Sequence, residues 1–298
     1  MATRKKFQGT GTALVTPFKK DGSLDEAALR RLVDFQIKGG VEALIPLGTT
    51  GETPTINHVE YERVFEIVKD QAKGRAKIFG GASSNNTLTA IENTKIVKKI
   101  GLDGALIVGP YYNKPTQEGY FQHYRAIAEA VDFPIIVYNV PGRTGGNIEA
   151  ATTLRMAEEI PNIIAVKEAS GSLAQIMEIA RNKPKDFSLL SGDDAVTLPI
   201  VSIGGDGCIS VVSNEVPRDF SDMVRASLEG RWNKALELHN KLLPLMNMNF
   251  IESSPIPVKA ALAMMGMIEE VYRLPLVKIS DKNREKLKKV LVELRLLE

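Results

Sequence analysis

Short, almost wholly apolar segments alternate along the chain with segments in which apolar residues recur every three or four positions. The first pattern predicts strands buried on both faces, and the second predicts amphipathic helices. Each predicted strand is followed by a helix or a helix-sized gap, at the spacing of roughly 25–30 residues that parallel βαβ units need. The eight expected strands are Gly11–Phe18, Ala43–Gly48 and those beginning near Lys77, Gly104, Pro134, Ile163, Phe187 and Gly207.

The first two helices have recognisable boundaries. Asp25–Gly39 carries apolar residues at helical spacing. The next helix is expected from about Asn57 to Lys73, because Asn57 is followed three residues later by Glu60, which is the arrangement of a capping box.

The repeat predicts an α/β fold, a (β/α)8 TIM barrel over residues 1–230. An open doubly wound sheet is the alternative, and such a sheet usually carries a glycine fingerprint in its first βα turn. Here the first strand leads into TPFKKDG, and eight units in about 230 residues fit a closed barrel better. Residues 231–298 are expected to form a docked C-terminal helical domain. Its helices are expected at Arg231–Leu245, Pro257–Met267 and Lys282–Leu297.

Composition and charge exclude several classes of function. The 298 residues include 38 basic and 36 acidic ones, a formal net charge of +2, and no basic stripe that would favour nucleic acid. No apolar run approaches the ~18 residues of a membrane span, and we expect no secretory signal. A cytoplasmic protein without a membrane or nucleic-acid partner is therefore expected.

Cysteine and histidine offer little chemistry. Cys208 is the single cysteine, so an intramolecular disulfide is impossible and a reducing compartment is natural. It lies in an apolar segment and is expected to be a small buried hydrophobe. The histidines, His58, His123 and His239, lie far apart without ligand spacing, so no metal site is expected.

The main candidate for chemistry lies at the end of a predicted strand, where barrels of this kind place their catalytic residues. Lys167 follows four apolar residues in a strand that should line the barrel interior. Burying an ammonium group is costly unless the group is paired. Two interpretations remain open: an ion pair with an acid such as Glu168, or an amine kept neutral by burial that attacks a carbonyl and forms an imine.

Two further candidates lie at the end of the preceding predicted strand and in the loop that follows it. Tyr138 would lie beside Lys167 if the registers match, and its hydroxyl could carry protons during imine formation. A core aromatic residue is the alternative. Arg143 lies in a Pro/Gly-rich loop at the same edge, where its planar guanidinium suits a carboxylate, although a solvated loop arginine would also explain it.

Two loops add polar and aromatic groups. Thr49 and Thr50, in GTTGE, precede a helix and offer hydroxyls and backbone N–H groups to an anion, although a turn with hydroxyl caps explains them too. Tyr111 and Tyr112 are adjacent aromatics in a Pro-bounded loop. Such pairs often pack against a partner subunit, and this pair could serve a site at the same time.

At these residues the chain resembles the dihydrodipicolinate synthase family, a group of Schiff-base-forming lyases related to pyruvate-dependent aldolases. The resemblance implies condensation of pyruvate with L-aspartate 4-semialdehyde, at the start of lysine and diaminopimelate synthesis. The matching segments span nearly the whole chain: GTTGE, GPYYNKPTQEG, YNVPGRTG, VKEASG, LLSGDD, GGDGCISV and PIPVKAAL.

The resemblance also implies roles for individual residues. Lys167 would form the Schiff base with pyruvate. Tyr138, Thr49 and Tyr112 would form a proton relay, with Tyr112 reaching in from a neighbouring subunit. The family is typically homotetrameric, a dimer of dimers, and needs no organic cofactor and no catalytic metal. The residues implied in substrate binding are Thr50 and the Ile209 backbone for pyruvate, Arg143 for the carboxylate of the semialdehyde, and Gly192.

An allosteric lysine site is implied at the dimer interface. Lysine-inhibited members typically carry a histidine where this chain has Tyr61 and a glutamate where it has Thr89. Loss of that carboxylate removes a partner for the effector's ammonium group, so weak or absent inhibition by lysine is expected. The residues implied in this pocket are Ser84, Asn85, His58 and Tyr111.

Two other functions remain open. N-acetylneuraminate lyases and 2-keto-3-deoxy-sugar-acid aldolases resemble the same barrel, lysine and tyrosine, but they usually differ around the loop after the second strand and in the arginine segment. GTTGE together with VPGRTG therefore favours the synthase. A non-catalytic barrel that binds small molecules is the third possibility.

Overall fold

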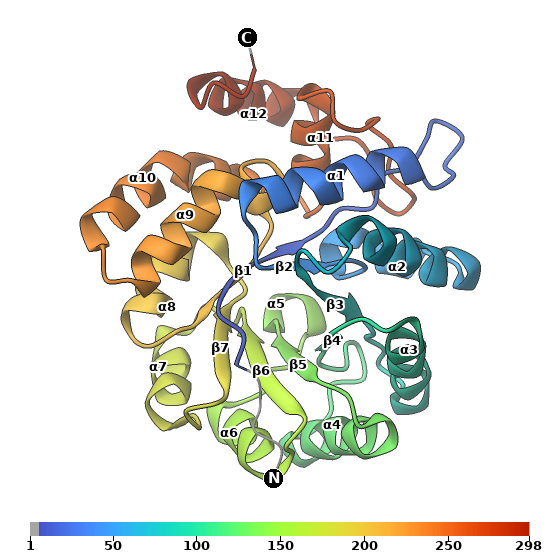
Figure 1. Cartoon of the computed structure of the whole chain (residues 1–298), viewed down its shortest axis with the longest axis vertical. Coiled ribbons are helices and arrows are strands. Elements are labelled where there is room, and N and C mark those ends of the chain that lie inside the picture. The colour runs from blue at the N-terminus through green and yellow to red at the C-terminus, as the bar shows by residue number, and fades with distance from the viewer. Residues whose placement is uncertain (1–5, 298) are drawn as a thin grey trace.

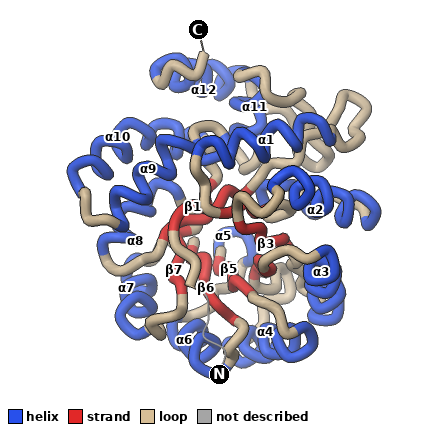
Figure 2. Tube along the Cα trace, viewed as in Figure 1, coloured by secondary structure: helices blue, strands red, loops and turns tan. Residues whose placement is uncertain are grey.

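Eight parallel strands close into one barrel in chain order, with the last strand pairing with the first (Figures 1 and 2). The computed structural model describes residues 6–297. The predicted (β/α)8 TIM barrel is confirmed. The strands are β1 (Gly9–Ala13), β2 (Ala43–Ile45), β3 (Lys77–Gly81), β4 (Gly104–Val108), β5 (Ile135–Asn139), β6 (Ile163–Glu168), β7 (Ser188–Ser191) and β8 (Gly207–Ser210).

Helices surround the barrel in the order that the sequence pattern predicts (Figure 2). The second helix starts with the expected capping box, because the Asn57 side chain accepts the Glu60 N–H and the Glu60 side chain accepts the Asn57 N–H. The helices up to residue 230 are α1 (Glu26–Gly39), α2 (His58–Ala72), α3 (Thr87–Ile100), α4 (Gln117–Val131), α5 (Pro141–Thr144), α6 (Ala150–Glu159), α7 (Leu173–Asn182), α8 (Thr197–Ser202) and α9 (Pro217–Leu228).

Alternation along the strands separates two apolar layers. Val137 and Val166 belong to the cluster between strands and helices, whereas Ile136 and Ala165 belong to the cluster inside the barrel. β5 and β6 reach this arrangement through a register shift next to Ile135. Successive side chains on a strand point to opposite faces, so the residues that follow Val137 and Val166 point inward.

Two predicted strands prove shorter than expected. The predicted strand Gly11–Phe18 is wrong at its end, since β1 stops at Ala13 and the Val15 N–H donates to the Asn214 side chain at 3.2 Å instead of to a neighbouring strand. The predicted strand Ala43–Gly48 stops at Ile45. Proline follows there, which has no N–H for a ladder, and then Leu47 adopts a positive φ of 55°.

Three helices follow the barrel, as expected, and lie along one side of the molecule (Figure 1). They share one buried apolar cluster with α9, in which Phe220 of α9 joins Leu242 and Leu287. The extension is therefore docked, while the domain boundary at residue 230 stays a prediction. None of the helices in residues 6–297 is long and apolar enough to cross a membrane. The three are α10 (Trp232–Met248), α11 (Ile256–Met264) and α12 (Asp281–Glu293).

Candidate active site

Lys167 and Tyr138 are direct neighbours at the ends of β6 and β5. Their Cα atoms are register partners, as the sequence analysis expected. The Lys167 Nζ lies 4.2 Å from the centroid of the Tyr138 ring. Only 5% of Lys167 and 6% of Tyr138 is exposed. A buried amine and a buried aromatic ring therefore lie side by side at the C-terminal end of the barrel.

Glu168 lies on the opposite face of β6 from Lys167. Its carboxylate accepts hydrogen bonds from Asn139 Nδ2 at 3.1 Å and from Gln175 Nε2 at 3.0 Å. The Ser170 N–H completes its shell at 2.6 Å. Lys167 therefore does not form an ion pair with Glu168. Amide donors outside the barrel occupy that carboxylate.

The end of β7 passes close to the Lys167 side chain. The Gly192 N–H donates to the Glu168 carbonyl at 2.8 Å. A Cβ atom at this glycine would lie 3.1 Å from Lys167 Cε and 2.7 Å from Ala169 Cβ. Glycine is needed here for space. Ile209 on β8 belongs to the same inner cluster as Tyr138. Of the predicted substrate-binding residues, Gly192 therefore lies beside the Lys167 side chain and Ile209 lies inside the barrel.

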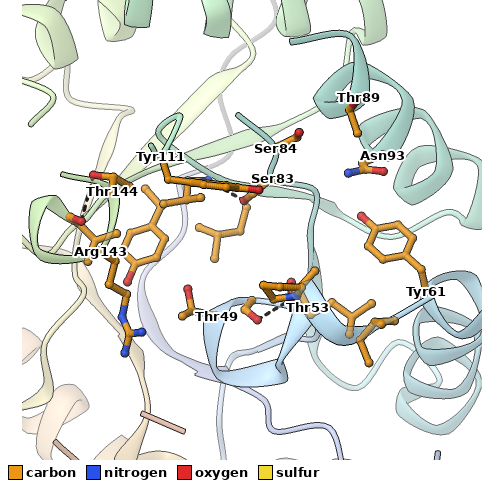
Figure 3. Close-up of a pocket in the computed structure, with 18 of the residues that line it drawn as sticks. Thr49, Thr53, Tyr61, Ser83, Ser84, Thr89, Asn93, Tyr111, Arg143 and Thr144 are labelled. Atoms are coloured by element: carbon orange, nitrogen blue, oxygen red, sulfur yellow. Dashed lines mark hydrogen bonds between the residues drawn. The ribbon is translucent and has the colours of Figure 1, made fainter. Parts of the chain in front are cut away.

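A cavity of about 520 Å³ opens beside Tyr138, and Thr49 and Arg143 also line it. Figure 3 shows Arg143 at one side of this space and Tyr61 at the other. Arg143 is on the short helix α5, and its Nη2 donates to the Ser254 carbonyl at 3.3 Å. The predicted arginine is thus at the cavity wall. It also touches the segment between α10 and α11.

The threonine pair forms a single 3₁₀ turn, Thr49–Gly51. Thr49 lines the cavity, whereas Thr50 is buried behind it. The Thr16 hydroxyl donates to the Gly51 carbonyl at 2.7 Å, and Glu52 closes the turn with a φ of 53°. The turn is therefore anchored by the Thr16 side chain, which comes from the segment after β1.

Tyr112 stands apart from the cavity of its own chain. It is 89% exposed and has a φ of 72°. Its N–H donates to the Thr144 carbonyl at 3.3 Å, and the Tyr111 carbonyl accepts from Asn85 Nδ2 at 3.1 Å. The loop is thus held in place while the Tyr112 side chain is exposed to solvent.

Three of the four expected allosteric residues, His58, Ser84 and Tyr111, line the same cavity, and Asn85 borders it through its bond to the Tyr111 carbonyl. No Asp or Glu is found among the described lining residues. The Tyr61 hydroxyl donates to the Gly81 carbonyl at 2.6 Å, and burial raises the pKa of this phenol. Tyr61 therefore fills its position as a neutral group.

Cys208 and His123 are not among the residues that line the cavity. Cys208 is fully buried, and burial raises the pKa of its thiol. The ring Nδ1 of His123 lies 3.0 Å from the Thr87 hydroxyl, and burial lowers the pKa of His123 to about 4. Within residues 6–297, no group of three or more His, Cys, Asp or Glu could hold a metal ion.

Sequence reasoning missed three charged residues behind the threonine turn. Glu52 ends GTTGE, and its carboxylate pairs with the ammonium of Lys259 in α11, which lies 207 residues away along the chain. The Arg273 N–H donates to the other Glu52 oxygen at 3.2 Å. One signal was available: Lys259 interrupts an apolar helix, as Lys167 interrupts an apolar strand.

Comparison with known proteins gives a consistent result. The model of the dihydrodipicolinate synthetase family matches residues 6–294. The 4-hydroxy-tetrahydrodipicolinate synthase of Koribacter versatilis is 58% identical over 97% of this chain and 96% of its own. That of Chloroherpeton thalassium is 51% identical over 99% and 98%. The crystal structure of dihydrodipicolinate synthase from Aquifex aeolicus has a TM-score of 0.95 and 44% identity, over 97% of this chain and 99% of that one. The chain belongs to the dihydrodipicolinate synthetase family.

Proposed function

We propose that this protein is a 4-hydroxy-tetrahydrodipicolinate synthase, a carbon–oxygen lyase that condenses pyruvate with L-aspartate 4-semialdehyde through an imine on Lys167. The observation that carries the proposal is the Lys167 amine against the Tyr138 ring at the C-terminal end of the barrel. Relatives up to 58% identical bear the same name. The enzyme acts in lysine and diaminopimelate synthesis in the cytoplasm, without an organic cofactor or catalytic metal.

The reaction begins with imine formation. The buried Thr50 and the Ile209 backbone hold the pyruvate carboxylate beside Lys167. The lysine amine attacks the keto carbon, and water leaves once the new hydroxyl is protonated. Tyr138, beside Lys167, and Thr49, on the wall of the same cavity as Tyr138, would pass protons to and from this carbon. The resulting iminium draws electrons from the neighbouring methyl group.

Loss of a methyl proton then turns the iminium into an enamine, which is a carbon nucleophile. The enamine attacks the aldehyde carbon of the semialdehyde, whose carboxylate is held by Arg143 at the cavity wall. The amino group of the bound semialdehyde next attacks the carbon that carries Lys167. The ring closes, the Lys167 amine leaves, and the enzyme returns to its starting state.

Tyr112 completes the proton relay from a neighbouring subunit in this proposal. The support is its 89% exposure and its position outside the cavity of its own chain. An exposed tyrosine in a fixed loop is a typical interface residue. In a homotetramer built as a dimer of dimers, each subunit of a dimer would supply its Tyr112 loop to the active site of the other.

Replacement of Arg143 by Ala is expected to raise the KM for the semialdehyde roughly 10- to 100-fold, the value of a lost charge-assisted hydrogen-bond pair. The KM for pyruvate should change less than about 2-fold, because pyruvate binds deeper, beside Lys167. Initial rates with each substrate varied in turn measure both values. Arg143→Lys is the matched control and should fall between wild type and Ala. Equal changes in both KM values would contradict the role of Arg143.

L-Lysine is expected to inhibit this enzyme weakly or not at all. The reason is that no described carboxylate lines the cavity that an effector's ammonium would enter. Steady-state rates measured against increasing L-lysine check this prediction. Thr89→Glu should increase sensitivity, because it adds a carboxylate to the cavity wall. Half-inhibition of the wild type at micromolar lysine would overturn the expectation.

A coupled assay tests the proposed function against its relatives. The enzyme is supplied with pyruvate plus L-aspartate 4-semialdehyde, and separately with N-acetylneuraminate or 2-keto-3-deoxygluconate. Turnover of the first pair alone is expected. Cleavage of either sugar acid at a comparable kcat/KM would instead identify a sugar-acid lyase, and no turnover of any substrate would favour a non-catalytic barrel.

A further inference from the structure

A buried ion pair joins the catalytic end of the barrel to the C-terminal extension. We infer that the Glu52–Lys259 pair, supported by Arg273, positions the Thr49–Gly51 turn for pyruvate. The extension would then be a positioning part of the active site. The inference rests on the proposed function, in which this turn binds pyruvate and passes protons.

A contribution to folding stability alone does not explain why the Glu52–Lys259 pair is buried. Lys259 is 0% exposed and Glu52 is 2% exposed. Taking two charges out of water is costly, and apolar residues of similar volume often stabilise a fold equally well or better. The arrangement is nevertheless complete, because Glu52 accepts from Lys259 on one oxygen and from the Arg273 N–H on the other. In some proteins a buried pair of this kind fixes one arrangement of the chain around it, and this is the role inferred for Glu52 and Lys259.

Aromatic rings hold the two cations. The Lys259 Nζ lies 4.4 Å from the centroid of the Phe18 ring and 5.3 Å from that of Tyr272. The Arg273 guanidinium lies 4.1 Å from the same Phe18 ring. Cations are attracted to the faces of such rings. Lys259 and Arg273 are therefore fixed in position and can act as rigid supports for Glu52.

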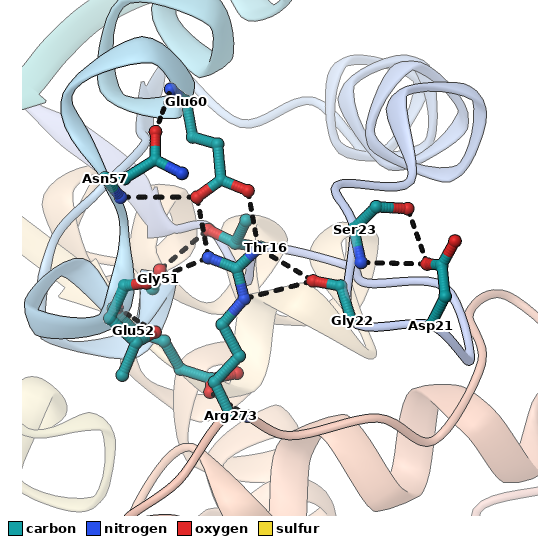
Figure 4. A network of polar contacts seen from close by, with 10 residues as sticks. Thr16, Asp21, Gly22, Ser23, Gly51, Glu52, Asn57, Glu60 and Arg273 are labelled. Atoms are coloured by element: carbon teal, nitrogen blue, oxygen red, sulfur yellow. Dashed lines mark hydrogen bonds and ion pairs between the residues drawn. The ribbon is translucent and has the colours of Figure 1, made fainter.

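Arg273 ties the surrounding loops together (Figure 4). Its guanidinium donates to the Glu60 carboxylate at 2.7 Å and to the carbonyls of Gly22 at 2.7 Å and Thr55 at 2.8 Å. Glu60 belongs to the first turn of α2. One side chain from the extension thus links the loop after β1, the segment after the threonine turn and the start of α2.

The network acts on the turn through Glu52. The Glu52 N–H donates to the Thr49 carbonyl at 3.2 Å, and the Glu52 carbonyl accepts from the Thr55 N–H at 2.9 Å. Its αL conformation is uncommon for a residue with a long side chain and needs support from its surroundings. Release of the carboxylate would let Glu52 relax. A shift of about 1 Å in a substrate-positioning group can cost on the order of 100-fold in rate.

The test compares two paired substitutions in the full chain. Glu52→Gln with Lys259→Met removes the charges and keeps similar volumes. Asp206→Asn with Lys183→Met does the same to a buried ion pair of 3.0 Å that lies before β8, at the opposite end of the barrel. Both double variants remove an ion pair and differ in its position. The second also breaks the 2.6 Å ion pair between Asp206 and Lys6, so it is the more severe loss of charge pairing.

We expect the Glu52/Lys259 double variant to have a pyruvate KM raised about 10-fold or more, with the semialdehyde KM within about 2-fold of wild type. Pyruvate adduct trapped by borohydride at low pyruvate should accumulate correspondingly more slowly. The Asp206/Lys183 double variant should keep both KM values, even if its melting temperature falls. Circular dichroism checks that both variants fold.

An unchanged pyruvate KM in a folded Glu52/Lys259 variant would overturn the inference, and so would an equal rise in the Asp206/Lys183 variant. If the first variant fails to fold, Glu52→Gln alone decides, since it removes the carboxylate charge of the pair and keeps an acceptor for Lys259 and for the Arg273 N–H. A pyruvate KM raised about 3-fold or more supports the inference, and a wild-type value refutes it. A wild-type protein that forms no pyruvate adduct would refute the proposed function first.

Discussion

Lys167→Ala is expected to lower kcat by at least about 10³-fold, the largest effect of any single substitution in this chain. The imine needs a primary amine at this position, and alanine has none. Lys167→Arg should be equally inactive, because a guanidinium stays protonated and cannot take the place of the amine. Initial rates at saturating substrate measure the loss.

Both Lys167 variants should remain folded, since Lys167 lies near the C-terminal end of β6 and the apolar residues of that strand are unchanged. Circular dichroism provides that control. If a folded Lys167→Arg protein kept more than about a tenth of wild-type kcat, general electrostatic assistance would replace covalent catalysis as the explanation.

Tyr138→Phe is expected to lower kcat about 10²- to 10³-fold, within the range that a positioned proton-transfer group contributes. The variant keeps the ring that packs inside the barrel and against Lys167, and it loses only the hydroxyl. The melting temperature should therefore change little. Rapid-quench trapping with borohydride should show slower formation of the pyruvate adduct.

Retention of wild-type adduct formation by Tyr138→Phe would show that Tyr138 is a packing residue only. The matched control is Tyr124→Phe. The Tyr124 hydroxyl is buried behind the barrel wall and donates to the Ile107 carbonyl at 2.9 Å. Loss of that hydroxyl should lower stability by about 1 kcal/mol without changing kcat.

Periodicity was enough to predict the barrel and the neighbourhood of Lys167 and Tyr138, since both follow from buried strands in chain order. It was not enough to predict which way Lys167 points. A register shift next to Ile135 aligns Tyr138 with Lys167 and turns Glu168 outward. A slip of one residue would exchange the two faces, and no residue pattern in the strand announces such a shift.

Long-range contacts limited the remaining predictions. Glu52 and Lys259 each stand in a segment that the sequence analysis singled out, but 207 residues separate them, and a charged residue does not reveal its partner. The end of β1 was overestimated for the same reason. The Val15 N–H donates a hydrogen bond to the side chain of Asn214, which follows the last strand of the barrel.

Pyruvate-dependent reduction with borohydride, followed by peptide mass spectrometry, tests the central chemistry most directly. A single peptide that contains residue 167 should gain the mass of a reduced pyruvate imine, and the gain should vanish when pyruvate or reductant is left out. A label on another lysine, or an unmodified Lys167 peptide after complete reaction, would contradict the account.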